Sequence, residues 1–260
     1  MIKNYNNIAI TADESFRAQN AKEELVEKYN FSEDINSDNI DLLVVLGGDG
    51  FMLHSLHNHL RHPIPVYGMN CGTVGFLLND YYSDDLMERI SNAKPTYIKP
   101  LEMKATTIDN KTYTAIAINE VSLLRQTSQA AHINIMIDDV KRVNEMVCDG
   151  VLLATPAGST AYNYSIGGPV IPIRSNILAL TPISPFRPRR WKGALLPDNA
   201  QIKFDIVDYE KRSVSAVADF REIRNVKSVS INEKPNHKLT LLFDEGHALE
   251  ERIISEQFRF

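Results

Sequence analysis

The sequence has few cysteines, no long apolar run and no excess of positive charge, and each shortage excludes a class of protein. Its 260 residues contain 2 cysteines, too few for a disulfide scaffold, and we expect Cys71 and Cys148 to be free thiols of a cytoplasmic protein. No apolar run reaches the roughly 18 residues that a membrane helix needs. The first residues lack the apolar core and cleavage site of a secretory signal. A formal net charge of −5 argues against a general nucleic-acid or membrane-surface protein.

Glycine is also scarce, but its placement is informative. The 12 glycines are fewer than the average usage of about 7% would give. Glycine is needed where the backbone takes positive φ or approaches another group closely, so we predict that clustered glycines mark backbone that contacts a ligand. All but Gly193 and Gly246 fall in two windows. These hold Gly47, Gly48, Gly50, Gly68, Gly72 and Gly75 in the first, and Gly150, Gly158, Gly167 and Gly168 in the second.

The first hundred residues alternate between strand and helix patterns, which predicts an α/β domain. The apolar run at 41–46 suits a strand buried on both faces of a parallel sheet. We expect Phe16 on the apolar face of the first helix. We expect the last helix to start with Ser83 as N-cap and with Asp84 and Asp85 in its first turn. The predicted strands are 7–11, 41–46 and 64–67, and the predicted helices are 15–29, a segment with Met52, Leu56 and Leu60 on one face, and 83–93.

After the prolines at 95 and 100 the pattern changes to short β-type runs with almost no helical period. This is typical of an all-β sandwich or barrel. We therefore predict a β-rich domain over 99–244 and an α/β domain over 1–98 plus about 245–260, to which a terminal helix over 246–257 returns. One interruption, 155–169, has turn residues at both ends and room for a short helix. The predicted runs include 103–108, 112–124, 133–137, 151–154, 201–207 and 213–218.

The sequence Gly47-Gly48-Asp49-Gly50 stands between a buried strand and a helix. Folds of the α/β class place ligands there, and glycines let backbone N–H groups approach phosphate oxygens. A carboxylate in a phosphate cradle needs another task, such as holding Mg²⁺ or taking a proton from a hydroxyl acceptor. The motif is neither a Walker A loop nor GxGxxG. Taken alone, it is equally compatible with a tight turn that has an Asp cap.

Three further segments carry unusual polar residues. The loop from Asn70 to Leu77 is either a plain connection or a second ligand loop. Asn119 and Glu120 interrupt an apolar β run, where burial is costly without partners. They make either a structural hydrogen bond or a contact to a hydroxyl-rich ligand such as a ribose. The stretch 155–169 combines hydroxyl residues, glycines and tyrosines, which suits a slot for a ring. It lacks GxSxG, so a serine nucleophile is unsupported.

Two charged clusters have ordinary interpretations. Four histidines, His54, His57, His59 and His62, fall near one helix, and without matching carboxylates or thiols we expect a solvated face rather than a metal site. Arg187, Arg189 and Arg190 form either a solvated loop or a contact to an anion or a subunit.

Taken together and in this order, these motifs resemble the NAD kinase family. The match uses GGDG at 47–50, GxxGFL at 72–77, NE at 119–120, and DG at 149–150 followed by TPAGSTAYNYSIGGP at 155–169. The last stretch is highly specific, whereas GGDG alone also occurs in lipid kinases and phosphofructokinases. The resemblance implies a Rossmann-like α/β N-terminal domain with a parallel sheet and a β-rich, sandwich-like C-terminal domain. It further implies ATP or polyphosphate as donor, NAD as substrate, Mg²⁺, and a homo-oligomer, a tetramer or dimer.

The resemblance also implies roles for individual residues. Asp49 would contact the ribose that bears the reacting 2′-hydroxyl and act as general base or orienter. Gly47, Gly48 and Gly50 would shape the donor phosphate site, and Thr155 would support the loop that follows it. The dinucleotide would be bound by Phe76, Asn119, Glu120, Asp149, Thr160, Ala161, Tyr162, Ser165 and Ser184.

The sequence departs from the family pattern at three places. The family often shows Leu where this chain has Val74, a change that should matter little. After Thr181-Pro182-Ile183, many members continue SPHS or APHS, whereas this chain has Ser184-Pro185-Phe186-Arg187. A later DG is replaced by Asp219-Phe220, which leaves the role of Asp219 open. Two rival functions remain at this stage. One is a lipid kinase that shares the GGDG loop, and the other is a noncatalytic dinucleotide-binding regulator.

Overall fold

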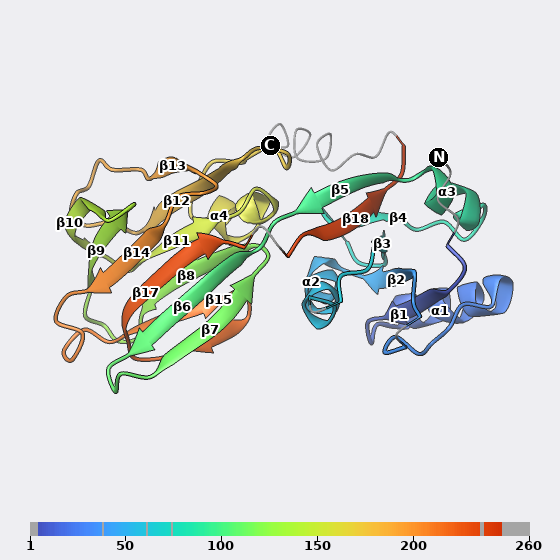
Figure 1. Ribbon diagram of the computed structural model, residues 1–260, viewed down its shortest axis with the longest axis horizontal. Helices are drawn as coiled ribbons and strands as arrows, with labels where there is room; N and C mark the ends of the chain where they lie inside the picture. The colour runs from blue at the N-terminus through green and yellow to red at the C-terminus, as the bar shows by residue number, and fades with distance from the viewer. Residues whose placement is uncertain (1–4, 38, 61, 74, 235–236, 246–260) are drawn as a thin grey trace. The chain divides into compact units, whose positions relative to one another are not determined.

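The computed structural model describes residues 5–245 except 38, 61, 74 and 235–236 (Figure 1). Contacts divide the chain into two compact units, one from Met1–Ile98 and His237–Phe260 and the other from Lys99–Asn236. We call them the N-terminal unit and the β unit. The expected boundary at 244 is therefore displaced, because strand β18 (Leu239–Phe243) pairs with strands of the N-terminal unit. The predicted helix at 246–257 lies outside the described residues.

A mixed sheet forms the centre of the N-terminal unit. Its order is β1-β2-β3-β18-β5, with β4 beside β3. The pairs β1–β2, β2–β3 and β3–β18 are parallel, and β5 is antiparallel to β18. Strand β2 is buried along its whole length, as its apolar run predicts. The bounds are β1 Ile8–Ala12, β2 Leu42–Gly47, β3 Val66–Asn70, β4 Asn79–Asp80 and β5 Lys94–Ile98.

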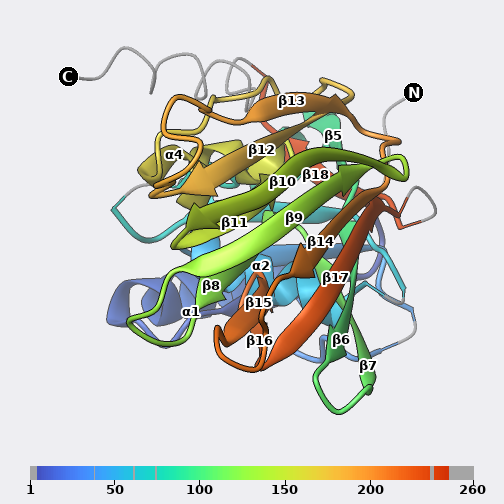
Figure 2. The ribbon, with the colours of Figure 1, turned by 90° about the vertical axis from the view of Figure 1, so that its left-hand side faces the viewer.

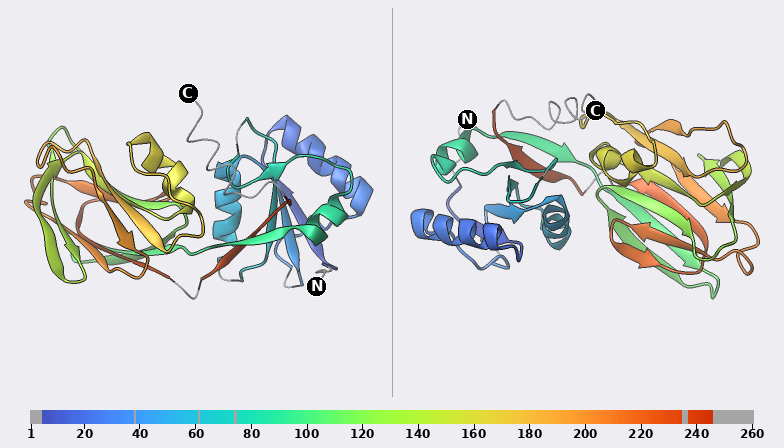
Figure 3. Two further views of the ribbon diagram at one scale, coloured as in Figure 1. Left: turned by 90° about the horizontal axis from the view of Figure 1, so that it is seen from above. Right: turned by 180° about the vertical axis from the view of Figure 1, so that it is seen from behind.

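Helices cover both faces of this sheet (Figure 3). Alternate residues of β2, Leu42, Val44 and Leu46, pack in one cluster with Leu25 of α1 (Phe16–Tyr29) and Leu86 of α3 (Leu86–Asn92). Helix α2 (Asp49–Asn58) lies against the opposite face. There a Cβ at Gly68 would lie 3.1 Å from Met52 Cε, so glycine lets α2 approach β3 closely.

Three expectations for these helices are wrong in detail. Phe16 is 82% exposed, because it is the first residue of α1 and precedes Ala18, the first buried position. Helix α2 ends before Leu60. Helix α3 has Asp85 as N-cap instead of Ser83. The Ser83 carbonyl accepts a hydrogen bond from the Tyr29 hydroxyl at 2.7 Å, which holds that residue outside the helix.

The β unit is a sandwich of two six-stranded antiparallel sheets. Figure 2 shows the first sheet, β10-β9-β14-β17-β6-β7, on the side that faces the viewer. The second has the order β13-β12-β11-β8-β15-β16. Their inner faces bury one apolar cluster that includes Phe204, Ile133 and Leu153. The bounds are β6 Leu101–Thr107, β7 Thr112–Ala117, β8 Glu120–Arg125, β9 Ala131–Ile137, β10 Val140–Cys148, β11 Gly150–Ala154, β12 Ile177–Ile183, β13 Ala194–Pro197, β14 Ile202–Ile206, β15 Val214–Ala218, β16 Arg221–Ile223 and β17 Val226–Glu233.

The predicted single run at 112–124 is two strands in different sheets. Strand β7 pairs with β6, and β8 pairs with β11 and β15. The chain crosses from one sheet to the other at Ile118 and Asn119. The interruption at 155–169 contains a 3₁₀ helix, Ala157–Thr160, and the short helix α4, Tyr162–Ser165, as expected.

Both cysteines are free and buried. Burial raises the pKa of the Cys71 and Cys148 thiols, so neither is an activated nucleophile. Among the residues that the structure describes, no helix is both long enough and apolar enough to span a membrane. The described residues also hold no group of three or more His, Cys, Asp or Glu side chains suited to a metal ion.

We predict that Gly150→Ala destabilises the β unit by about 2–3 kcal/mol, because overpacking of a tight site costs free energy. An added Cβ would overlap the carbonyl oxygen of Leu123 on the neighbouring strand β8, and backbone cannot move aside. Gly50→Ala is the control, since a Cβ there meets nothing within 4 Å among the described residues. Urea unfolding measures the free energy of unfolding of both variants. Equal stability of the two variants would contradict this reading of the sheet.

Candidate functional site

The GGDG segment joins a strand to a helix at the carboxyl edge of the N-terminal sheet. Gly47 ends β2, Gly48 is the N-cap of α2, and Asp49 is its first residue. The Asp49 carboxylate accepts two backbone hydrogen bonds, from Phe76 N to Oδ2 at 2.8 Å and from Leu77 N to Oδ1 at 2.9 Å. The two loops that sequence analysis singled out separately are therefore in contact, and Asp49 joins them.

The three glycines of GGDG have different reasons to be glycine. A Cβ at Gly47 would lie 2.8 Å from Asp13 Oδ2, so this residue gives room to a neighbouring side chain. At Gly48 and Gly50 a Cβ would meet nothing within 4 Å among the described residues. Gly48 also has ordinary extended backbone, with φ −101° and ψ 178°. No packing contact in the described structure explains these two glycines, so the space beside them is open to a ligand.

Asp13 is a second carboxylate at this edge, and sequence analysis missed it. It follows β1, and its N–H donates to Leu46 O of β2 at 2.9 Å. Its Oδ1 accepts from Ser15 N at 2.9 Å. Its position directly after a predicted strand could have identified it as a site residue, because the carboxyl ends of adjacent parallel strands meet at one edge of the sheet.

The second loop is fixed at both ends. At its start, Cys71 N donates to Gly47 O at 3.0 Å, and Gly72 N donates to Asn70 Oδ1 at 2.9 Å. Near its end, Leu77 and Leu78 are buried and Phe76 is half-buried. The loop is therefore a built part of the edge rather than a plain connection.

In the β unit, Asn119 and Glu120 lie at the corner where the chain changes sheets. The Asp219 carboxylate accepts hydrogen bonds there from the backbone N–H groups of Ile118 at 2.7 Å, Asn119 at 2.9 Å and Glu120 at 3.2 Å. Asp219 itself has φ 53°, a region that Asp tolerates better than most residues. The missing glycine at 220 thus leaves the corner intact, and Asp219 is what holds it.

Two side-chain atoms at this corner are buried without a hydrogen-bond partner, Asn119 Oδ1 and Glu120 Oε2. Burial, and then the nearby negative charge of Asp219, raise the pKa of the Glu120 carboxyl to about 8. At neutral pH the carboxyl group therefore keeps its proton and can donate a hydrogen bond, while the amide oxygen accepts one. Unsatisfied buried polar atoms are costly, so the corner is suited to a ligand that supplies both an acceptor and a donor.

Thr155 ties the 155–169 segment to the same corner. Its hydroxyl donates to Ile118 O at 2.7 Å and accepts from Gly158 N at 3.1 Å, and its N–H donates to Asn119 O at 2.9 Å. A Cβ at Gly158 would overlap Asn119 O. Glycine at 158 is therefore needed for the close backbone approach that brings this segment to Asn119.

Asn163 holds the 155–169 segment together, and sequence analysis gave it no role. Its buried amide donates to Ser159 O at 3.2 Å and Pro169 O at 2.9 Å, and its Oδ1 accepts from the Thr181 hydroxyl at 2.7 Å. The Ser159 hydroxyl is likewise used internally, since it donates to Pro156 O at 2.7 Å. Thr160, Ala161 and Tyr162 are half-buried and Ser165 is exposed, which leaves these four predicted residues accessible to a ligand.

Asp149 and Ser184 lie away from the Asn119 corner. Strand β11 starts after Asp149 and ends at Ala154, which is opposite Glu120. Four residue steps of about 3.3 Å put the two ends roughly 13 Å apart. Asp149 N donates to Ile183 O at 3.0 Å, next to Ser184, and Arg125 Nε contacts Asp149 Oδ1 at 2.5 Å. The predicted contacts Asn119 and Glu120 therefore lie at the opposite end of this sheet from Asp149 and Ser184. Phe76 belongs to the N-terminal unit.

The arginine cluster lies beside Asp149 and Ser184. Arg187 O accepts from Val147 N at 2.9 Å. Arg187 and Arg189 place their guanidinium groups 5.6 and 4.7 Å from the Phe186 ring centroid. All three residues are exposed. The predicted histidine face is in part engaged, because His59 Nδ1 is 2.9 Å from Ser55 O.

Comparison with known proteins assigns both units. The model of the ATP-NAD kinase N-terminal domain matches residues 4–91, and that of the ATP-NAD kinase C-terminal domain matches 118–232. The chain is 52% identical over 251 residues to the NAD kinase of Caulobacter vibrioides, covering 96% of this chain and 95% of that one. The chain belongs to the NAD kinase family. The NAD kinase of Cereibacter sphaeroides is 56% identical over 218 residues, which cover 84% of this chain and 86% of that one.

Solved structures of the family share the fold. The crystal structure of yeast NADH kinase complexed with NADH has a TM-score of 0.81 at 23% identity, and covers 96% of this chain and 86% of that one. An NAD kinase from Archaeoglobus fulgidus in complex with ATP has a TM-score of 0.77 at 23% identity, and covers 96% and 98%. The predicted fold, an α/β domain with a β-rich sandwich, is confirmed.

The protonated Glu120 predicts a pH-dependent stability. The folded state keeps this proton up to a pH of about 8, whereas an unfolded glutamate loses it near pH 4.3. The contribution of this proton to the free energy of unfolding is thus fully present below about pH 4 and is lost as pH rises through 8. The free energy of unfolding should therefore fall by about 2–4 kcal/mol between pH 5 and 8. The Glu120→Gln variant cannot ionise at this position and should not show that fall.

Urea unfolding at several pH values tests this, and Glu102→Gln is the matched control. Lys234 lies 2.9 Å from Glu102 Oε2 and lowers the pKa of that carboxyl. The Glu102→Gln variant should therefore show the same decline in the free energy of unfolding between pH 5 and 8. If the free energy of unfolding of Glu120→Gln falls with pH as steeply as that of the unmodified protein, Glu120 does not carry a proton in the folded state.

Proposed function

We propose that the chain transfers a phosphoryl group from ATP or inorganic polyphosphate to the 2′-hydroxyl of the adenosine ribose of NAD, giving NADP. The observation that carries this is the identity of about half over nearly the full length of NAD kinases. GGDG, NE and the 155–169 segment also occur in the order that the family shows. A cytoplasmic location and a homo-oligomer belong to the same proposal, and edge strands such as β7 and β16 offer surfaces that could pair between subunits.

The β unit is proposed to bind NAD. The buried Asn119 Oδ1 and Glu120 Oε2 lack partners, and the hydroxyls of a ribose or the edge of an adenine would supply them. Tyr162 packs beside a cluster that runs from Ala154 to Ile183, and so connects the Asn119 corner with the Asp149 and Ser184 end. A dinucleotide has a nucleoside at each end, which fits two groups of contacts separated by the length of a strand.

The edge of the N-terminal unit is proposed to act on the donor and on the acceptor hydroxyl. Backbone N–H groups at the start of α2 favour anions, and the open space at Gly48 and Gly50 admits phosphate oxygens close to the chain. Asp49 is proposed to orient the 2′-hydroxyl and accept its proton. Its two oxygens accept hydrogen bonds from Phe76 N and Leu77 N, which hold the carboxylate in place for that role. Phosphoryl transfer depends mainly on such positioning and on charge stabilisation.

A magnesium ion fits this edge as part of the donor complex. Mg²⁺ in phosphoryl-transfer sites takes one or two carboxylates together with substrate phosphates, and Asp13 and Asp49 both lie at this edge. When bound, the ion would neutralise charge that develops on the phosphates. Asp13 would hold it together with the donor phosphates, and its hydrogen bond from Ser15 N keeps it in place without the ion, whereas Asp49 keeps the role of base.

We predict that Asp49→Asn lowers kcat at least about 100-fold, the usual scale for a general base, and leaves the Kd for NAD within about threefold. The test incubates purified protein with NAD, Mg²⁺ and either ATP or polyphosphate and measures NADP. Asp34→Asn, an exposed residue of the same unit, is the control with unchanged kcat. Binding of NAD without any NADP from either donor would instead identify a dinucleotide-binding regulator. Phosphorylation of a lipid but not of NAD would identify a lipid kinase.

Gly48→Ala tests the donor site separately. The methyl group meets nothing within 4 Å among the described residues, so we expect the free energy of unfolding to change by less than about 1 kcal/mol. It would occupy the space proposed for phosphate oxygens, so we expect kcat/KM for the donor to fall at least about tenfold, or 1.4 kcal/mol. The KM for NAD stays the same. Unchanged donor kinetics would remove Gly48 from the donor site.

A further inference from the structure

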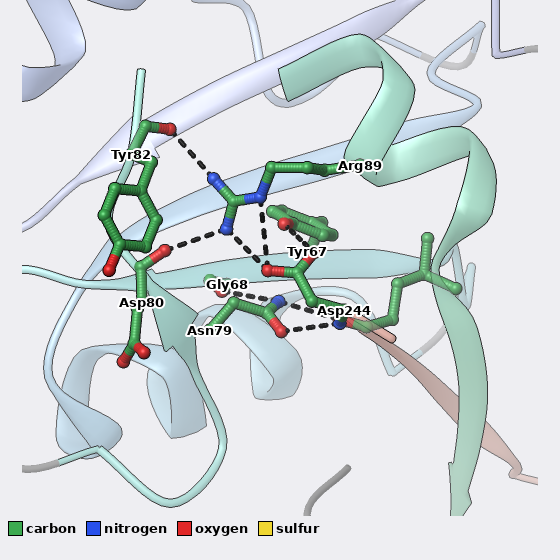
Figure 4. Close-up of polar contacts among 8 residues, drawn as sticks. Tyr67, Gly68, Asn79, Asp80, Tyr82, Arg89 and Asp244 are labelled. Carbon is green, nitrogen blue, oxygen red and sulfur yellow. Dashed lines mark hydrogen bonds and ion pairs between the residues drawn. The ribbon is translucent and has the colours of Figure 1, made fainter. Parts of the chain in front are cut away.

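Asn79 is a fully buried amide two residues beyond the Phe76–Leu77 pair, and neither the sequence motifs nor the proposed mechanism uses it. Its side chain is 0% exposed. The amide nitrogen donates to Gly68 O of β3 and to Leu242 O of β18, both at 3.0 Å. Its Oδ1 accepts from Asp244 N at 2.9 Å. Figure 4 shows the amide between β3 and the end of β18.

A network of side-chain hydrogen bonds holds this junction together. Asn79 uses both amide hydrogens and its carbonyl oxygen. On the far side, the Asp244 carboxylate contacts Arg89 Nη2 at 2.6 Å and Nε at 3.2 Å and accepts a hydrogen bond from the Tyr67 hydroxyl. Arg89 also donates to Asp80 O and Tyr82 O, each at 2.9 Å (Figure 4). Asn79 is thus fixed to two strands that are far apart in the sequence.

The junction lies directly beside the donors that hold Asp49. Phe76 N and Leu77 N bind the two carboxylate oxygens of Asp49. Between these donors and Asn79 stands only Leu78, which is buried and packs at the Gly68 position against which Met52 of α2 also lies. The segment 76–79 is therefore anchored at Asn79, and the residues two and three positions earlier, Leu77 and Phe76, present their N–H groups to the carboxylate.

We propose that Asn79 is a positioning residue for Asp49: by fixing the segment 76–79 to β3 and β18, it sets the place and direction of the two N–H groups that hold the carboxylate. Strand β18, which follows the β unit in the chain, thereby helps to build the edge of the N-terminal sheet that carries Asp49. This inference rests on the function proposed for Asp49, but the contact itself is measurable without turnover.

The first test is amide hydrogen exchange in the full-length protein. In Asn79→Ala, exchange at Phe76 and Leu77 should quicken at least tenfold relative to the unmodified protein. The matched control is Tyr67→Phe, which removes the hydroxyl that binds Asp244 and leaves all three Asn79 hydrogen bonds. There the same two amides should change by less than threefold. Asn79→Ser, which keeps one hydroxyl donor, should lie between the two and serves if Asn79→Ala does not fold.

The second test is steady-state kinetics with NAD and ATP. Displacement of the base affects the transition state more than substrate binding, so the Asn79 variants should lose 10- to 100-fold in kcat with both KM values within threefold. The acid limb of the kcat profile should move to higher pH, because fewer N–H donors then stabilise the ionised carboxylate. In an Asp49→Asn background, Asn79→Ser should have no further effect on kcat.

Two results would overturn the proposal. One is unchanged exchange at Phe76 and Leu77 in both Asn79 variants. The other is an equal loss of kcat in Tyr67→Phe and Asn79→Ser, which would make the effect a general loss of stability. Failure of the proposed function has a different signature, namely an unmodified protein that makes no NADP. In that case the exchange result still decides whether Asn79 controls the segment.

Discussion

Both candidate sites depend on one interaction, a carboxylate that accepts hydrogen bonds from backbone N–H groups where the chain leaves regular structure. Where a strand ends, its N–H groups lose their partners, and a buried N–H without an acceptor is costly. Asp49 accepts two of them from the second loop of the N-terminal unit. Asp219 accepts three at the corner where β7 gives way to β8. Charge-assisted bonds of this kind are stronger than neutral ones, so irregular backbone at both places has a defined shape.

The two carboxylates nevertheless differ in what remains for a ligand. Asp219 is used to hold backbone, and its charge contributes to keeping the neighbouring Glu120 protonated. At this corner the two side-chain atoms without partners are thus a neutral hydrogen-bond donor and an amide oxygen. Such groups suit the hydroxyls and ring nitrogens of a nucleoside. A mildly acidic chain can bind a nucleoside in this way, and a cluster of exposed arginines, Arg187, Arg189 and Arg190, lies near Asp149.

The sequence was sufficient to predict the local structure wherever one face or one whole strand is apolar. Strand β2, helix α1 and the alternation of β14 follow directly from their apolar patterns. The terminal position of Asp49 and the accessible residues of the 155–169 segment followed from glycine spacing and from resemblance. Pairing across long separations was not predictable. Strand β18 has an apolar pattern that fits either unit, and only its hydrogen bonds with β3 and β5 decide. The structural roles of Asp13, Asp219 and Asn163 were missed for the same reason, since each bonds to backbone far away in sequence or within an irregular segment.

Three asparagine side chains show how a buried amide that serves the fold differs from one that is suited to binding. Asn79 and Asn163 are fully buried, and each satisfies both its nitrogen and its oxygen within the protein. Asn119 is less buried as a residue, yet its Oδ1 has no partner. Three other buried atoms of the described residues also lack a hydrogen-bond partner: Gln126 Nε2, Arg212 Nε and His237 Nδ1. The Asn119 corner differs from these because two such atoms, Asn119 Oδ1 and Glu120 Oε2, belong to adjacent residues. A partner from outside the chain would remove the cost of that pair, which supports the proposal that a nucleoside binds at the Asn119 corner.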